Sequence, residues 1–312
     1  MDRRVAGVDI GTLTCRLLIA DVSATGSLTE RCSERRILRL GEGVDQSKRL
    51  KNEAMDRVLE CLREWRRVID RYLVQARTAV ATSAVRDAQN RQQFVDRVKG
   101  ETGLDVDILT GEEEAHRTML GIRSGLSNDI TDVLALDIGG GSTEFIMARQ
   151  GQAPSVRSID MGVVRLSERL LLHDPPTAEE IAQARTWIRR ETTKALADMP
   201  RGTGLTFVGT AGTITSLAAM AQQLPAYEPA RIHHYRLPYE TVARLEQEVL
   251  SRSKSARIGM PGLEHNREDV IAAGAIILRT VMDTLGEREC LVSDRGLREG
   301  VLIDLARRMA RS

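Results

Sequence analysis

Aromatic residues and cysteines are both scarce in this sequence of 312 residues. Phe, Trp and Tyr make up only 3% of it, so its hydrophobic cores must be built from Val, Leu, Ile, Ala and Met. The four cysteines have no CxxC spacing and no nearby histidine partner; they are Cys15, Cys32, Cys61 and Cys290. Disulfide frameworks and zinc sites are recognised by such spacings. We therefore expect reduced thiols, as in a cytosolic protein.

The sequence also lacks a large charge of either sign and any long apolar segment. Its net charge of +1 argues against a nucleic-acid-binding surface and against an acidic tail. No apolar run approaches the roughly 20 residues needed to cross a bilayer. The first residues enter a strand pattern without a signal-peptide core. We therefore expect a cytoplasmic protein with neither a membrane nor a nucleic-acid partner, in which any anion site depends on local arrangement.

Two segments half a chain apart share one pattern. Val5–Asp21 aligns without a gap with Val133–Arg149, so that Asp9 corresponds to Asp137. Each copy is an apolar strand, a turn of Gly, Ser or Thr, and a second apolar strand, which predicts a β-hairpin. The repetition predicts two similar domains that face each other.

The domain boundary is predicted just before the second hairpin. The length suits two domains of about 150 residues each, and Asn128–Thr131 is a polar turn. We predict an N-terminal domain over residues 1–127 and a C-terminal domain over residues 128–312. The last helix, about 298–312, is expected to pack back on the first domain.

Hydrophobic periodicity predicts alternating strands and helices along the chain. Apolar residues from Met55 to Tyr72 follow helical spacing, and Thr177 with Glu180 forms a capping-box pair that opens a helix to about Leu196. The other predicted strands are Thr78–Thr82, Val106–Leu109, Leu205–Val208 and Cys290–Ser293, and the other helices are Gln92–Lys99, Val270–Leu285 and one from Arg298. This order predicts the α/β class.

The second hairpin turn carries the strongest functional pattern. Its three glycines, Gly139, Gly140 and Gly141, allow backbone N–H groups to point into a common space and bind an anion. Ser142 and Thr143 add hydroxyl donors. The flanking acids, Asp137 and Glu144, are placed to hold a hydrated Mg²⁺, which requires few protein ligands. The alternative is a plain hairpin whose Asp accepts from turn amides.

Two further segments are candidate anion contacts. The first turn, Asp9–Thr14, has only Gly11, so binding there depends on the hydroxyls of Thr12 and Thr14 and the amides between them. Arg16 follows as an anion contact or a solvated charge. A third segment lies between a strand and a helix, where helix N–H groups attract anions, although close packing also requires Gly. Its residues are Gly209, Thr210, Gly212 and Thr213.

A run of three acids follows Thr110 at a helix start. Thr110 and Glu113 fit a capping box, and Glu112 is interpreted as solvated. Glu114 has no local role; it is a general base for water or one more acid that favours the helix dipole.

Basic residues near predicted turns are candidates for contacting a polyanion or are solvated charges. They are Arg86, Arg267 and Arg298. His233, His234 and His265 lack metal-ligand spacing and are interpreted as structural.

Several of these segments together resemble the exopolyphosphatase/guanosine pentaphosphate phosphatase (Ppx/GppA) family, within the actin, heat-shock chaperone and sugar kinase superfamily. They are Val8–Arg16, Ala81–Ala88, Leu109–Ala115, Leu136–Ile146, Asp160–Leu166, Gly209–Thr215 and Ser293–Leu302. The resemblance covers nearly the whole chain. It implies two duplicated actin-like (ribonuclease H-like) domains, with mixed sheets flanked by helices and a cleft between them.

The resemblance also implies roles for individual residues. Glu114 would be the catalytic base, Asp137 and Glu144 would belong to the Mg²⁺ site, both turns would bind phosphates, and Arg86 would contact the polyanion. The chain departs from the family pattern at Leu13, where an amide side chain is usual, at Ala211, where Ser is usual, and at Arg295-Gly296. The helical C-terminal domains of longer members are expected to be absent, which favours shorter substrates.

The expected function is that of an exopolyphosphatase, a hydrolase that acts on phosphoric anhydrides. Mg²⁺ or another hard divalent cation is the expected cofactor, inorganic polyphosphate the expected substrate, and a homodimer the expected assembly. The alternatives are a guanosine pentaphosphate phosphohydrolase with its nucleoside near Gly209–Thr213, a sugar-kinase-like phosphotransferase, and a non-catalytic polyphosphate or nucleotide sensor.

Overall fold

The structure is a computed structural model that describes residues 2–199 and 204–311. The chain forms two compact units. Unit 1 comprises Met1–Gly125 and Arg295–Ser312, and unit 2 comprises Leu126–Asp294. The chain passes from unit 1 to unit 2 after Gly125, a few residues before the predicted polar boundary. It returns to unit 1 at Arg295, so the last helix belongs to unit 1. Among the described residues, no helix is long and apolar enough to cross a membrane.

Unit 1 is built on a mixed sheet with the strand order β3-β2-β1-β4-β5. β1, β2 and β3 are antiparallel neighbours, whereas β4 and β5 run parallel to β1. The strands are β1 (Arg3–Ile10), β2 (Thr14–Val22), β3 (Leu28–Ile37), β4 (Ala76–Ala81) and β5 (Val106–Ile108). The helices are α1 (Val44–Ser47), α2 (Asn52–Arg71), α3 (Ser83–Asp87), α4 (Arg91–Thr102), α5 (Gly111–Arg123) and α13 (Leu297–Arg311).

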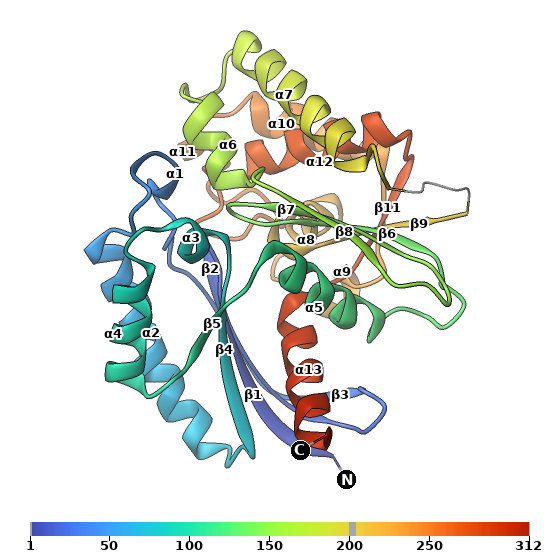
Figure 1. Cartoon of the computed structure of the whole chain (residues 1–312). Coiled ribbons are helices and arrows are strands. Elements are labelled where there is room, and N and C mark those ends of the chain that lie inside the picture. Colours follow the sequence, from blue (N-terminus) through green and yellow to red (C-terminus); the bar gives the residue numbers. More distant parts are fainter. Residues whose placement is uncertain (1, 200–203, 312) are drawn as a thin grey trace. The chain divides into compact units, whose positions relative to one another are not determined.

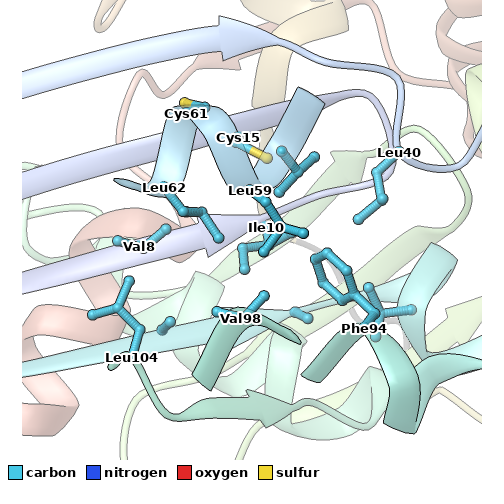
Figure 2. Close-up of a cluster of buried hydrophobic side chains, with 14 of the residues drawn as sticks. Val8, Ile10, Cys15, Leu40, Leu59, Cys61, Leu62, Phe94, Val98 and Leu104 are labelled. Carbon is cyan, nitrogen blue, oxygen red and sulfur yellow. The ribbon is translucent and has the colours of Figure 1, made fainter. Parts of the chain in front are cut away.

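Alternating side chains of β1 and β2 place one core on each face of this sheet. Val8 and Cys15 pack with Leu59 of α2 and Phe94 of α4 on one face (Figure 2). Val5 and Leu18, which point the other way, pack with Leu302 of α13. Helices α2 and α4 therefore cover one face, and α5 and α13 cover the other (Figure 1). Aliphatic residues dominate both cores, as the scarcity of aromatics predicts.

Helices α5 and α13 approach closely because two glycines lie in their contact. A Cβ on Gly121 would lie 1.8 Å from the carbonyl oxygen of Gly296, and one on Gly300 would lie 1.6 Å from that of Arg117. Real Cβ atoms do not come so near to backbone, so both positions require Gly. This packing fixes the C-terminal helix beside the helix that carries Glu114.

Unit 2 repeats the same sheet plan, with one additional edge strand. Its order is β10-β11-β9-β6-β7-β8, in which β8-β7-β6-β9-β11 corresponds to β3-β2-β1-β4-β5. The strands are β6 (Val133–Ile138), β7 (Thr143–Ala148), β8 (Ser155–Ile159), β9 (Thr206–Thr210), β10 (Arg236–Pro238) and β11 (Glu289–Val292). The predicted duplication and the α/β class of two mixed, helix-flanked sheets are thus confirmed.

The helices of unit 2 include several that the periodicity did not predict. They are α6 (Val163–Leu170), α7 (Ala178–Leu196), α8 (Ala211–Ala221), α9 (Pro229–Ile232), α10 (Tyr239–Leu250), α11 (Lys254–Arg257) and α12 (Ile271–Leu285). The predicted capping box of Thr177 and Glu180 is present at the start of α7. Helices α6, α9, α10 and α11 were missed, as were strands β3, β8 and β10. Several of these elements are too short to give a clear periodic signal, such as α9, α11 and β10 with three or four residues each.

Candidate functional site

The Gly-rich turn of unit 2 joins β6 to β7. The N–H of Gly139 donates to the carbonyl of Ser142 across the turn, at 3.0 Å. The three glycyl carbonyls are held from outside the hairpin: Val163 donates to Gly139 at 3.0 Å and Val164 donates to Gly140 at 2.8 Å. Arg165 Nε donates to the Gly141 carbonyl at 2.9 Å. All three donors come from the first turn of α6.

These bonds determine which way the turn's N–H groups point. In a planar trans peptide the C=O of one residue and the N–H of the next lie on opposite sides. The N–H groups of Gly140, Gly141 and Ser142 therefore point away from α6. None of the three has a hydrogen-bond partner within residues 2–199 and 204–311. Three successive N–H groups on one side of a turn form the concave anion site known as a nest.

Asp137 and Glu144 face each other across the same hairpin. They are directly opposite in the register of β6 and β7, so their side chains lie on one face of the sheet. Glu144 is 1% exposed, and its carboxylate accepts a hydrogen bond from Ser158 at 2.7 Å. Two carboxylates directly opposite each other are the kind of pair that a bound cation stabilises.

The two acids fit a magnesium site by their chemistry. No cluster of three or more His, Cys, Asp or Glu side chains with metal-binding geometry occurs among the described residues. Mg²⁺, however, keeps several waters and is bound through one or two carboxylates together with substrate phosphates. A pair of opposed carboxylates beside an anion nest suits this mode of binding. The predicted metal role of Asp137 and Glu144 stays a prediction.

Thr143 has a hydroxyl that the sequence analysis interpreted as a donor to an anion, and the structure shows this hydroxyl hydrogen-bonded within unit 2. Its side chain is fully buried, and the hydroxyl donates a hydrogen bond to the carbonyl of Met161. The hydroxyl thus links β7 to the segment before α6 and is engaged inside unit 2. In this structure the Thr143 hydroxyl therefore holds the turn in place, and its predicted phosphate contact stays a prediction.

The first turn, in unit 1, is closed in the same way. The N–H of Gly11 donates to the carbonyl of Thr14 at 3.1 Å, as Gly139 does to Ser142. The carbonyl of Thr12 accepts from Gly41, and that of Leu13 accepts from both Leu38 and Arg39. The N–H groups of Thr12 and Leu13 have no partner in the described part of the chain. The first turn therefore offers amides as donors.

Two side chains of the first turn pack inside unit 1, and the predicted hydroxyl contacts of Thr12 and Thr14 stay predictions. Thr12 is 7% exposed, and its hydroxyl accepts a hydrogen bond from the N–H of Ala84 at 3.2 Å. The hydroxyl therefore supports the start of α3. Leu13, which stands where the family has an amide side chain, is 5% exposed. It packs inside unit 1, while its backbone N–H remains available as a donor. The loss of the amide side chain therefore leaves the backbone part of this site intact.

Asp9 and Arg16 occupy the register position of unit 1 that Asp137 and Glu144 occupy in unit 2. They pair directly across β1 and β2, and Arg16 donates to Asp9 at 3.3 Å. Burial raises the pKa of the Asp9 carboxyl, and the Arg16 guanidinium opposes that rise. The Oδ1 atom of Asp9 has no hydrogen-bond partner among the described residues. Unit 1 thus has an internal ion pair where unit 2 has two acids, which makes unit 2 the better metal site.

Glu114 lies in the first turn of α5, behind the capping box of Thr110 and Glu113 that the sequence predicted. Glu112 is exposed, also as predicted, whereas Glu114 is only 8% exposed. One terminal nitrogen of Arg86, on α3, donates hydrogen bonds both to the Glu114 carboxylate at 3.1 Å and to the Leu109 carbonyl at 2.8 Å. Arg86 therefore orients Glu114, a contact that the sequence did not suggest.

The third candidate segment joins β9 to α8. Thr210 is the residue before the helix, and Ala211 has a left-handed φ of 69°. Gly209 is required for packing, because a Cβ there would lie 2.5 Å from Cys290 Sγ. Gly212 makes room for Arg267, since its Cβ would lie 2.4 Å from a guanidinium nitrogen. The first N–H groups of α8, which include those of Gly212 and Thr213, face the helix start as donors.

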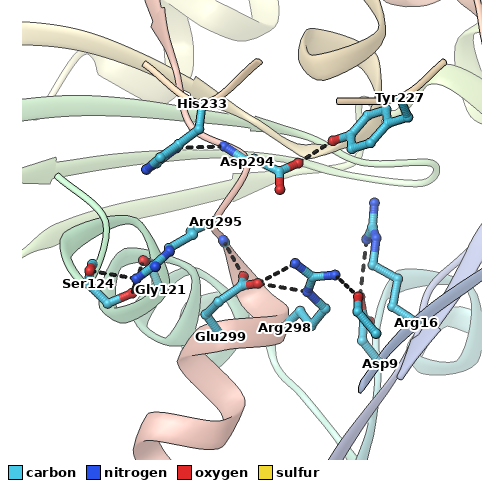
Figure 3. A network of polar contacts seen from close by, with 12 residues as sticks. Asp9, Arg16, Gly121, Ser124, Tyr227, His233, Asp294, Arg295, Arg298 and Glu299 are labelled. Carbon is cyan, nitrogen blue, oxygen red and sulfur yellow. Dashed lines mark hydrogen bonds and ion pairs between the residues drawn. The ribbon is translucent and has the colours of Figure 1, made fainter. Parts of the chain in front are cut away.

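Arg267 and Arg298 are neither solvated nor exposed. Arg267 is 3% exposed and donates to Glu264 at 2.7 Å, beside the start of α8. Arg298 donates to Glu299 at 2.7 Å (Figure 3). It also donates to Ser33 at 2.7 Å. For Arg298, the solvated-charge interpretation is wrong. Arg267 remains a candidate anion contact because it stands at a helix N-terminus.

Two other groups in Figure 3 are structural. Arg295, an unusual residue for the family pattern, donates to the carbonyl of Ser124 at 2.7 Å and so caps the end of α5. In unit 2, His233 accepts from the N–H of Asp294 at 3.2 Å, and Tyr227 donates to the Asp294 carboxylate.

His265 contacts the Glu268 carboxylate at 3.2 Å. All four cysteines are free thiols, as predicted.

The fold and these turns define a class of protein. Two ribonuclease H-like units, each with a hairpin turn that carries backbone N–H groups without a hydrogen-bond partner in the described part of the chain, form a two-domain actin-like protein that handles phosphate groups. The chain belongs to the Ppx/GppA phosphatase family, whose model matches residues 18–309. As a member of a phosphatase family, it is a hydrolase.

Individual relatives agree with this assignment. The chain is 35% identical to exopolyphosphatase 2 of Mycobacterium tuberculosis, over 97% of this chain and 98% of the relative. It resembles the crystal structure of the Aquifex aeolicus Ppx/GppA family member with a TM-score of 0.84, at 32% identity and 100% coverage of both chains. An exopolyphosphatase from Cytophaga hutchinsonii gives a TM-score of 0.88 at 27% identity, with 97% of each chain covered.

Proposed function

We propose that this protein is an exopolyphosphatase that releases the terminal phosphate of inorganic polyphosphate with the help of Mg²⁺. The observation that carries the proposal is the row of N–H groups at Gly140, Gly141 and Ser142 that faces away from α6, beside the opposed acids Asp137 and Glu144. An anion nest next to a carboxylate pair can bind a phosphate together with its metal. The exopolyphosphatase name of a 35%-identical relative supports the choice of substrate.

The chemistry is an in-line displacement at phosphorus. A water oxygen attacks the terminal phosphorus, its proton passes to Glu114, and the P–O bond to the rest of the chain breaks. Arg86 holds one oxygen of Glu114 at 3.1 Å and so fixes the direction of the base. The turn amides stabilise charge on the transferred group, since phosphoryl transfer depends mainly on positioning and electrostatics. Mg²⁺, held by Asp137 and Glu144, would supply further charge neutralisation.

Arg86 serves two purposes in this proposal. One terminal nitrogen is occupied by Glu114 and Leu109. Its Nε and its other terminal nitrogen have no partner within the described residues. These nitrogens are the ones that would contact the polyanion. The expected homodimer and the cytoplasmic location stay predictions.

The test is orthophosphate release from long polyphosphate, short polyphosphate and guanosine pentaphosphate, each with Mg²⁺ and with EDTA. We expect metal-dependent release from polyphosphate, and a large loss in Asp137→Asn. Asp198→Asn, an exposed acid of the same unit, is the matched control and should retain activity. Release from guanosine pentaphosphate alone would make the chain a GppA-type enzyme. Binding without release from any substrate would indicate a sensor and refute the enzyme assignment.

A further inference from the structure

The anion nest of unit 2 depends on a buried arginine outside the hairpin. Arg165 is the third residue of α6 and only 4% exposed. Its Nε donates to the Gly141 carbonyl at 2.9 Å, and its ion pair with Asp160 is longer, at 3.6 Å, to a largely exposed carboxylate. Burying a guanidinium is costly unless its hydrogen bonds are made. The bond to the turn is therefore one of the contacts that offset the cost of burying this group.

We propose that Arg165 is a positioning residue for phosphate, which rests on the function proposed above. By holding the Gly141 carbonyl, Arg165 turns the N–H of Ser142 to the opposite side, because the two groups belong to one planar peptide. The α6 amides of Val163 and Val164 do the same for the N–H groups of Gly140 and Gly141. Of these three contacts, the one from Arg165 determines the direction of the Ser142 N–H, and it is the contact made by a side chain.

Gly162 shows how closely α6 is fitted to the turn. A Cβ at Gly162 would lie 2.3 Å from the carbonyl oxygen of Gly140 and 2.4 Å from the nitrogen of Gly141. Both atoms are backbone, so they cannot move aside without displacing the turn. Gly162→Ala therefore disturbs the same three donors without changing any charge. Substitutions at Arg165 and at Gly162 therefore test the direction of these N–H groups by independent means.

The experiment measures the dissociation constant of inorganic phosphate by isothermal titration calorimetry with Mg²⁺ present. Phosphate cannot be turned over, so binding is measured alone. We expect Arg165→Met and Gly162→Ala each to raise this constant about tenfold, which corresponds to about 1.4 kcal/mol. Arg165→Lys keeps the charge and one donor, and it should lose less. The KM for tripolyphosphate should rise in parallel.

Matched controls separate positioning from general destabilisation. Arg169→Met removes an exposed arginine one turn further along α6, and Gly100→Ala adds a Cβ in open space; both should bind phosphate normally. Val249→Ala creates a cavity in the core of unit 2, so it should lower the melting temperature with an unchanged dissociation constant.

Two results would overturn the proposal. One is wild-type phosphate affinity in Arg165→Met and Gly162→Ala, which would leave the proposed function standing. The other is an equal loss of affinity in Val249→Ala, which would make the role of Arg165 merely structural. A wild-type protein that neither binds phosphate nor releases it from any substrate would refute the proposed function as well.

Discussion

Replacing Glu114 by Gln isolates the chemical step from binding and folding. Gln has the shape of Glu but cannot accept the water proton at neutral pH. A positioned base contributes about 10²–10⁴-fold in rate, which equals about 2.7–5.4 kcal/mol of activation free energy. We therefore expect kcat to fall by at least about a hundredfold, while KM changes little because the turn amides are untouched.

The structure also limits the effect of this substitution on stability. The oxygen of the new amide can still accept from Arg86, and Arg86 keeps its bond to the Leu109 carbonyl. The lost charge assistance is worth about 1 kcal/mol, or a few degrees in Tm for a chain of this size. A larger fall in Tm would show that Glu114 is mainly structural.

The assay is orthophosphate release from tripolyphosphate with Mg²⁺, together with the Tm of each variant. Glu112→Gln removes an exposed acid of the same helix turn and is the matched control, with wild-type kcat expected. Arg86→Lys should fall between the two, because Lys keeps a donor for Glu114 but lacks the Nε and the second terminal nitrogen that we propose contact the polyanion. Unchanged kcat in Glu114→Gln would refute the assignment of the base.

The remaining predictions concern stability. Thr110→Ala removes the cap of α5 and should lower the free energy of unfolding by about 1 kcal/mol in urea titrations, with no effect expected if the cap were unimportant. Ala211→Gly relieves a left-handed residue and should raise this free energy by about 1 kcal/mol; a decrease would contradict the reasoning. The hydrogen bond from Arg4 lowers the pKa of Asp21 from 3.8 to about 2. Because the folded-state pKa is depressed, the ionised carboxylate stabilises the protein above pH 3.8, and this contribution is lost as pH falls towards 2. Asp21→Asn should therefore melt below wild type at neutral pH and converge with it in acid, whereas a gap in Tm that did not depend on pH would refute this origin.

The sequence by itself determined the features that arise from neighbouring residues. The two hairpins are visible because their strands and turns are continuous in the chain, and the capping box of Thr110 and Glu113 is complete within four positions. The same locality made Glu114 stand out, since solvation accounts for Glu112 and the helix cap accounts for Glu113. The family resemblance rests on such short segments, and the family model confirms it.

The direction of groups that bind or support the site was decided only by the tertiary structure. Arg165 reaches the Gly141 carbonyl from 24 residues further along the chain, and Gly41 donates to the Thr12 carbonyl from beyond the two strands β2 and β3. Sequence spacing also could not show that the hydroxyl of Thr143 faces Met161, because a side chain's partner depends on what packs above its strand. A turn's residues specify that N–H donors exist; the segments that bind its carbonyls decide where those donors point.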